Sequence, residues 1–242
     1  WQRMQAGAEE EAKKHHIKLL TMAPDKETDV ERQYQLIENA IQQKVAAILL
    51  APAGTKELIT AIKKANQANI PVLLLDTKID RKEAQRLAVQ VESFIGSDNF
   101  KGGELAGKAL AESIYFTGSV GIIEGISGHE TAESRRLGFL HALHEYPEIK
   151  VVASQTAHWE RERSYSVTQN MLQTHPDIRA IFCASDEMAM GSVEALRALQ
   201  RKDVVIVGFD ANPDALAYVI NKKITATVAQ SPRYMGMKGV YY

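Results

Sequence analysis

The stretch AIFCASDEMAMG, residues 180–191, decides the fold, because it joins a buried strand to a helix through small polar residues. Residues 178–183 form a short apolar run that is typical of a strand, and Ala184 and Ser185 then turn the chain. Asp186 is predicted to cap the helix that follows. In open α/β sheets, ligands bind beside the carboxyl ends of the strands, so this stretch predicts one edge of a ligand site.

The same construction recurs four more times along the chain. Apolar strand-like runs end in small or acidic residues at positions 74–77, 94–99, 124–127 and 207–210. Five polar strand ends in one chain indicate a site that is built from several loops and is specific for a small polar molecule.

Strands and helices are predicted to alternate along the whole chain, which indicates parallel sheets with right-handed crossovers. Strands are expected at residues 17–22, 45–50, 72–75, 93–96, 120–124, 151–156, 178–183, 204–207 and 225–228. Helices are expected at residues 1–16, 29–44, 55–68, 100–115, 131–145, 161–175, 186–200 and 213–220, with a short helix or loop at 80–90. So many strands, with so many polar ends, favour two lobes over a single sheet.

Composition excludes several classes of protein. The chain has 242 residues and a formal net charge of −1, which gives no electrostatic basis for binding nucleic acid. Nothing approaches the roughly 20 uninterrupted apolar residues of a membrane-spanning helix. Cys183 is the only cysteine, so no intrachain disulfide can form, and its place at the end of a buried strand predicts inert packing.

Both ends of the sequence are expected to be incomplete. The chain opens directly in a helix with no strand before it, and no signal peptide precedes Trp1. Residues 231–242 likewise stop inside a predicted helix. We therefore expect the natural polypeptide to extend beyond both ends.

Five segments resemble the periplasmic sugar-binding proteins of ABC transporters, of the ribose and galactose/glucose types. They are NQANIPVLLLD (66–76), GSDN (96–99), DEMAMGSVEALRAL (186–199), VVIVGFDANPDAL (204–216) and ITATVAQSP (224–232). The resemblance implies the type I periplasmic binding protein fold, an α/β fold with two Rossmann-like lobes, a three-crossing hinge and a ligand cleft between the lobes. One lobe would comprise residues 1–97 and 231–242, and the other residues 98–230.

The resemblance also implies a set of ligand-binding residues. Trp1 and Trp159 fall where the family places flat aromatic walls against the sugar ring. Asp76 and Asp210 match carboxylates that bind hydroxyl groups, and Gln230 matches an amide at a hinge crossing. The alternatives are a core or hinge plug for Trp159 and a helix cap for Asp210.

Two further positions depart from the family pattern, and a third would lie at a hinge crossing. Thr77 stands where the ribose type has an arginine, which argues against a copied ribose preference. Ser185 stands where asparagine is usual, so a bidentate amide contact would be lost or made through water. Ser97 lies at a crossing between the lobes, where it would serve the hinge or the ligand.

The segment GISGHETAESR, residues 125–135, allows two alignments. Against the galactose/glucose type, His129 and Arg135 are ligand residues, and Arg135 would donate two parallel hydrogen bonds to adjacent hydroxyls. Against the ribose type, the ligand position falls on Glu133. The alternatives are a loop or capping role for His129 and a surface ion pair between Arg135 and Glu133 or Glu130.

The resemblance implies a solute-binding protein that captures a monosaccharide or related polyol by hinge closure and delivers it to an ABC transporter permease. By resemblance it would be a monomer, without a cofactor or metal, in the periplasm or lipid-anchored outside the cytoplasm. The alternative is the sugar-sensing domain of a LacI-type repressor or of a membrane signalling receptor. An enzyme is not favoured, because the chain lacks the G-x-S-x-G, Walker-type and H-E-x-x-H motifs.

Overall fold

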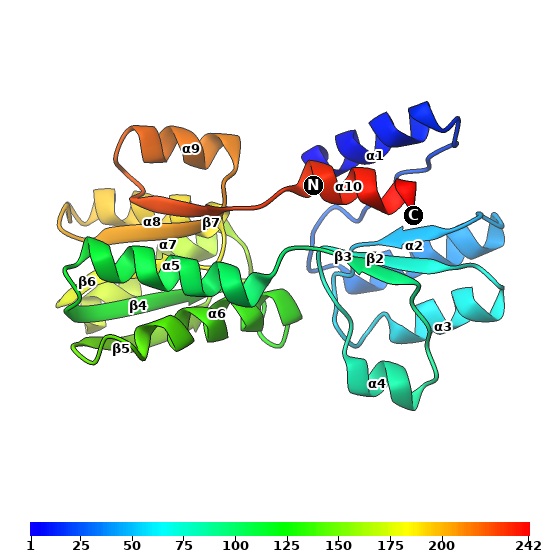
Figure 1. Cartoon of the computed structure of the whole chain (residues 1–242). Helices are drawn as coiled ribbons and strands as arrows, with labels where there is room; N and C mark the ends of the chain where they lie inside the picture. Colours follow the sequence, from blue (N-terminus) through cyan, green and yellow to red (C-terminus); the bar gives the residue numbers. More distant parts are fainter. The chain divides into compact units, whose positions relative to one another are not determined.

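The computed structural model describes residues 1–242 and divides into two compact units (Figure 1). Unit 1 comprises Trp1–Ser97 and Ser231–Tyr242, and unit 2 comprises Asp98–Gln230. Each unit has its own sheet, and every strand pairing in both sheets is parallel. The predicted α/β class is therefore confirmed.

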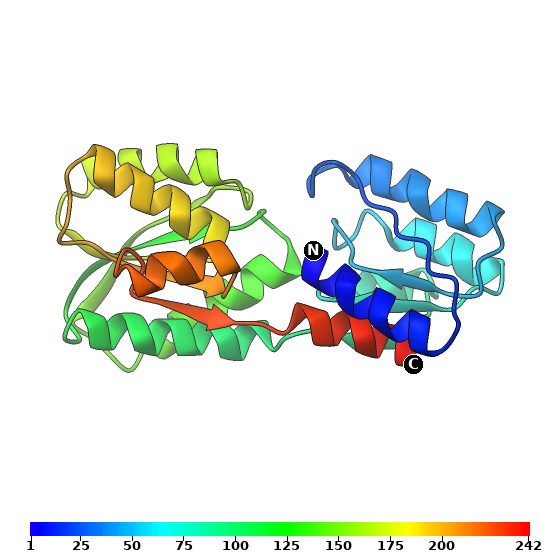
Figure 2. The ribbon, with the colours of Figure 1, turned by 90° about the horizontal axis from the view of Figure 1, so that it is seen from above.

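Unit 1 is a three-layer unit around a three-stranded sheet in the order β1–β2–β3. Its strands are β1 (Ile48–Leu50), β2 (Val72–Leu75) and β3 (Ser93–Ile95). Its helices are α1 (Gln2–Lys14), α2 (Val30–Gln42), α3 (Ile59–Gln67), α4 (Arg81–Arg86) and α10 (Pro232–Tyr241). Helices α1 and α10 pack together on one face of the sheet, and α2 and α3 pack on the other (Figure 2).

Two predictions for unit 1 are wrong. Residues 17–22 form no strand, because no neighbouring strand pairs with them and a strand needs a hydrogen-bonded partner. Ile17, Leu20 and Met22 are consequently exposed. Helix α3 begins at Ile59 rather than at residue 55, because residues 55–58 form turns before the helix starts.

Unit 2 contains a five-stranded sheet in the order β5–β4–β6–β7–β8. Its strands are β4 (Gly118–Glu124), β5 (Ile149–Thr156), β6 (Ile178–Cys183), β7 (Val205–Asp210) and β8 (Ala226–Ala229). Its helices are α5 (Asn99–Ser113), α6 (Glu130–Leu143), α7 (Arg161–Thr174), α8 (Asp186–Ala198) and α9 (Pro213–Ile220). The pair α5 and α6 covers one face, and α7 and α8 cover the other (Figure 2).

The order of strands in unit 2 creates a switch point. The chain passes from β4 outward to β5, then returns to β6 on the other side of β4 and continues outward to β7 and β8. In doubly wound proteins, ligands bind at the carboxyl edge of the sheet beside such a switch point. The core beneath it includes Phe139 and Phe182, whose rings stack with centroids 4.5 Å apart.

Glycines bring α5 and α6 into backbone contact. A Cβ on Gly103 would lie 2.1 Å from the carbonyl oxygen of Arg135, and one on Gly138 would lie 1.9 Å from that of Phe100. Neither position leaves room for a side chain, so the two helices can pack this closely only with glycine. The close approach sets the start of α5 beside the second turn of α6.

Candidate functional site

Arg135 is the centre of the polar side chains at the carboxyl edge of the unit 2 sheet. Its side chain is almost fully buried, and its Nε donates to Asn99 Oδ1 at 2.9 Å. Its Nη1 donates to the carbonyl oxygen of Ala184 at 2.6 Å and to Asp210 Oδ1 at 3.2 Å. These bonds join α6 to the start of α5, the end of β6 and the end of β7, so Arg135 gathers four chain segments.

The guanidinium of Arg135 also lies against two aromatic rings. Its Cζ is 3.9 Å from the centroid of the Phe209 ring and 5.6 Å from that of the Trp159 ring. A Cβ on Gly102 would lie 2.4 Å from the Phe209 ring, so glycine at that position makes room for the ring. Because a guanidinium is planar and stacks on aromatic faces, these contacts fix its plane as well as its position.

Asp210 is the carboxylate of the site. It ends β7 with a φ of 117°, and Ala211 follows with a φ of 54°, so two residues with a Cβ adopt left-handed backbone. Its Oδ1 accepts from Arg135 and, at 2.7 Å, from Gln230 Nε2. Strained backbone of this kind is found preferentially at functional sites. The side chain is 22% exposed.

Trp159 forms an aromatic wall in the loop between β5 and α7. His158 and Trp159 both have positive φ, and the indole lies over Gly125, where a Cβ would come within 2.2 Å of the ring. The ring of His129 meets it edge to face, with centroids 6.1 Å apart. Together, Gly125 and the αL backbone hold the indole face at this edge of the sheet.

Two buried polar atoms of this cluster have no hydrogen-bond partner within the protein. They are Nε1 of Trp159, a donor, and Oε1 of Gln230, an acceptor. A buried polar group without a partner costs about 1–3 kcal/mol, which a bound hydroxyl group can recover. A donor and an acceptor left open beside Arg135 and Asp210 match the dual hydrogen-bonding character of a hydroxyl.

The other two predicted residues of α6 and α8 have different surroundings. Glu133 receives a hydrogen bond from Arg136 Nη2 at 2.9 Å and makes no pair with Arg135. Ser185 is the N-cap of α8, and its hydroxyl accepts from the backbone of Met188 at 3.3 Å. The predicted cap at Asp186 is therefore wrong, because Ser185 takes that place and Asp186 is the first residue of the helix.

Four predicted residues belong to unit 1. Asp76 follows β2 with a φ of 61°, and the buried Thr77 donates from its hydroxyl to Asp76 Oδ2 at 3.3 Å. Trp1 is the N-cap of α1 and is 62% exposed, and Ser97 closes the first part of unit 1 after β3. Asp76 and Thr77 thus form a small polar pair at the carboxyl end of β2.

Sequence reasoning missed three residues of the unit 2 cluster. Asn99 holds Arg135 Nε, Phe209 stacks beneath the guanidinium, and the buried Asp186 binds the loop after Asp210. Asn99 is the last residue of the segment GSDN, directly before a predicted helix, and this position could have indicated a role at the site. Phe209 lies inside an apolar strand and gives no such signal.

Burial shifts the pKa of two groups near this edge. It raises the pKa of the Cys183 thiol to about 12, so this cysteine is an inert packing group as predicted. It also raises the pKa of the Asp186 carboxyl to about 7, against the hydrogen bonds from Thr227 and Asn212 that favour the charged form.

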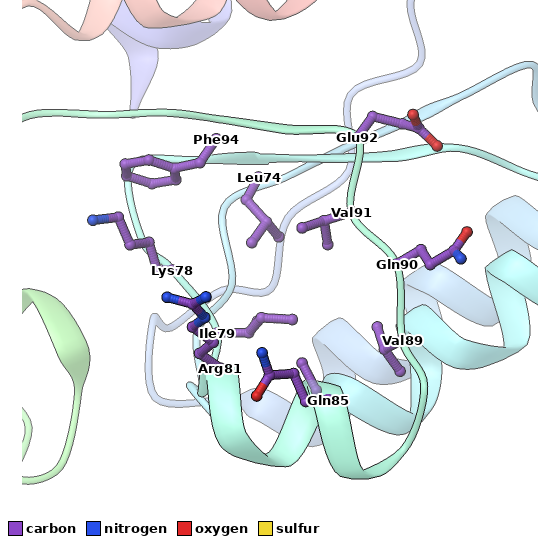
Figure 3. A pocket seen from close by; sticks show the side chains of 11 residues that line it. Leu74, Lys78, Ile79, Arg81, Gln85, Val89, Gln90, Val91, Glu92 and Phe94 are labelled. Atoms are coloured by element: carbon purple, nitrogen blue, oxygen red, sulfur yellow. The ribbon is translucent and has the colours of Figure 1, made fainter.

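A separate cavity of about 510 Å³ lies in unit 1 between α4 and the sheet (Figure 3). Its walls are mostly apolar and include Leu74, Ile79 and Phe94, while Lys78 and Arg81 line its rim. It contains none of the predicted site residues. No group of three or more His, Cys, Asp or Glu side chains could hold a metal ion, and no helix is long and apolar enough to cross a membrane.

The polar cluster of unit 2 lies at the switch point of a parallel sheet, where proteins of this architecture bind ligands. Comparison with known proteins identifies the class. A family model described as periplasmic binding protein domain matches residues 1–242, and the chain belongs to this family. The predicted recognition and fold are confirmed.

Relatives of known binding activity share most of their length with this chain. The ribose import binding protein RbsB of Bacillus subtilis is 36% identical over 233 residues, which cover 96% of this chain and 72% of the relative. The D-allose-binding periplasmic protein of Escherichia coli is 35% identical, with 99% and 78% covered. A solute-binding protein of Actinobacillus succinogenes, solved with bound D-allose, is 40% identical with a TM-score of 0.93, covering 98% of this chain and 83% of that one.

Proposed function

We propose that this chain is the solute-binding component of an ABC sugar importer and binds a monosaccharide, an aldose or related polyol, without changing it chemically. The observation that carries the proposal is the cluster of Arg135, Asp210 and Trp159 at the switch point of unit 2. A sugar ring presents hydroxyl groups at its rim and C–H bonds on its faces, and this cluster supplies a charged pair and a flat aromatic face.

The hydrogen-bonding capacity left in the cluster supports this substrate class. Arg135 uses Nε and Nη1 within the protein, which leaves its Nη2 donors for a ligand. Gln230 Oε1 adds an open acceptor and Trp159 Nε1 adds an open donor. The relatives are named for ribose, D-allose and D-apiose, all of them sugars.

We infer the role and the location of the protein from its family. We assign ligand contacts to both units, with Asp76, Thr77, Ser97 and Trp1 in unit 1, and hinge closure as the means of retention. The partner is an ABC transporter permease, and the location is the periplasm or the outer face of the membrane. The protein acts as a monomer and has no catalytic role.

A thermal-shift screen over pentoses, hexoses, inositols and their derivatives tests this proposal, with D-ribose and D-allose as the first candidates. A ligand at 100 times its Kd stabilises the native state by about 2.7 kcal/mol, or roughly 5–10 °C in Tm for a chain of this size. Stabilisation by another class of small molecule, with none by any sugar or polyol, would overturn the assignment.

Two variants decide which residue of α6 contacts the sugar. Arg135→Lys removes the planar fork and is expected to weaken binding at least tenfold, because an ammonium cannot reproduce its directed bonds. Glu133→Gln, whose side chain faces Arg136, is expected to leave Kd unchanged. Weaker binding by Glu133→Gln, with full binding by Arg135→Lys, would place the contact on Glu133 instead.

A further inference from the structure

Asp186 is the most buried carboxylate near the site, and none of the ligand contacts proposed above involves it. Its residue has no exposed surface, and both carboxylate oxygens accept hydrogen bonds. Oδ1 accepts from the hydroxyl of Thr227 at 2.7 Å, and Oδ2 accepts from the backbone N–H of Asn212 at 2.7 Å. Both donors lie in segments that flank Asp210, one in β8 and one in the loop after β7.

The hydroxyl of Thr227 extends this network to the strained part of the loop. Its oxygen accepts from the backbone N–H of Ala211 at 3.3 Å, so its hydrogen is available to Asp186. Two successive amides of the loop, at Ala211 and Asn212, are thus tethered to a single carboxylate. The tether holds the left-handed backbone of Asp210 and Ala211, which orients the Asp210 carboxylate.

The Asp186 carboxylate packs closely against the backbone of β7 at Gly208. A Cβ on Gly208 would lie 2.6 Å from Asp186 Oδ1 and 3.2 Å from Cβ of Ala189. Glycine at position 208 therefore permits the start of α8 to approach β7, and any side chain there would displace the carboxylate. The segments DEMAMG (186–191) and VGFD (207–210) are separate in the sequence, and only the fold brings them into contact.

We infer that Asp186 is a positioning residue, whose ionised carboxylate holds the loop that presents Asp210 and so makes sugar affinity depend on pH. This inference rests on the proposed function. An ionised carboxylate accepts from both Thr227 and Asn212 as a charged acceptor, whereas a protonated carboxyl is neutral and holds both donors more weakly. Protonation therefore releases part of the loop and lowers the affinity for the sugar.

The charged groups around Asp186 do not cancel this effect. Asp210 at the end of β7 and Glu187 in α8 both disfavour a negative charge on Asp186. Arg135 of α6 faces Asp210, and Arg161 of α7 binds Glu194, so neither cation is bonded to Asp186. Asp214 of α9 is exposed. Burial raises the pKa of Asp186 to about 7, which puts the transition within the range where the protein can be assayed.

Calorimetric titration of D-ribose and D-allose between pH 5.5 and pH 8 tests the inference, with wild type, Asp186→Asn, Thr227→Val and Thr227→Ser. Wild type is expected to bind roughly 5–10-fold more weakly at pH 5.5 than at pH 8. Asp186→Asn and Thr227→Val are expected to bind weakly at both values and to lose most of this dependence. Thr227→Ser keeps the hydroxyl and is expected to behave as wild type. Unchanged affinity and pH dependence in Asp186→Asn would overturn the inference.

A measurement without ligand separates this inference from the proposed function. The backbone amide proton of Asn212, followed by NMR, is expected to titrate with a midpoint near pH 7 in wild type and to show no such transition in Asp186→Asn. An Asn212 signal that is flat with pH in wild type would refute the tether even where sugars bind. If no sugar binds and the signal still titrates, the substrate assignment fails while the tether stands.

Discussion

Removal of the Asp210 carboxylate has consequences for stability and binding that can be worked out directly from the contacts in the structure. In Asp210→Ala, the buried Arg135 guanidinium loses its only ion-pair partner, and Gln230 Nε2 loses an acceptor. Breaking a buried pair on one side costs about 3–5 kcal/mol when the remaining charge has no other contact. Arg135 keeps Asn99, the Ala184 carbonyl and the Phe209 ring, so we expect a smaller loss, about 1–3 kcal/mol of unfolding free energy.

The effect of Asp210→Ala on binding is expected to exceed its effect on folding. Hydrogen bonds to a charged group contribute about 1.5–3 kcal/mol, so the variant should bind the sugar roughly 10–150-fold more weakly. Asp210→Asn retains an acceptor for Arg135 and should recover most of the stability but not the affinity. Calorimetry gives Kd and urea denaturation gives the free energy of unfolding, with Asp214→Asn, exposed on α9, as the matched control. Affinity within twofold of wild type in Asp210→Ala would refute the role of this carboxylate.

Three further predictions address the wall, the buried carboxyl and the cysteine. Trp159→Ala should weaken sugar binding by about 1–3 kcal/mol. Gly125→Ala leaves the tryptophan unmutated and should also weaken binding, because a Cβ at position 125 would displace the indole. Full affinity in both variants would show that the indole is not part of the site. Folding raises the pKa of Asp186 from 3.8 to about 7, so its contribution to the free energy of unfolding is largest below pH 4 and falls as the pH rises to 7. This contribution is measured as the free energy of unfolding of wild type minus that of Asp186→Asn. A difference that grows with pH would contradict the prediction. Cys183 should resist alkylation in the native protein and react after unfolding, and rapid native labelling would show that the strand end is open.

The strand-and-helix pattern of unit 2 could be predicted from sequence because each segment is decided locally. Strand β6 has the predicted bounds, and α9 begins and ends at the predicted residues. Both have the simple signals of a buried apolar run and of proline at the first helical turn. In contrast, residues 17–22 have the composition of a strand but no paired neighbour, and pairing is a tertiary property.

Most residues of the candidate site could be predicted from the sequence, but the hydrogen bonds and ion pairs between them could not. Asp210 and Arg135 were both expected at strand ends or helix starts, yet nothing in their separation of 75 positions indicates that they pair with each other. The pairing depends on the close packing of α5 and α6 and on the order of the strands. The role of Asp186 was hidden for the same reason, since a helix-start aspartate is ordinarily an exposed cap.

The most direct test of the account is whether the sugar contacts the indole of Trp159. The chain has only two tryptophans, so the indole N–H signals of Trp1 and Trp159 can be assigned with a single Trp159→Phe variant and followed during titration with D-ribose or D-allose. We expect a saturable shift of the Trp159 signal, with the same Kd as calorimetry, because its unpartnered Nε1 gains a neighbour. A sugar that binds with measurable heat while the Trp159 signal stays unmoved would contradict it.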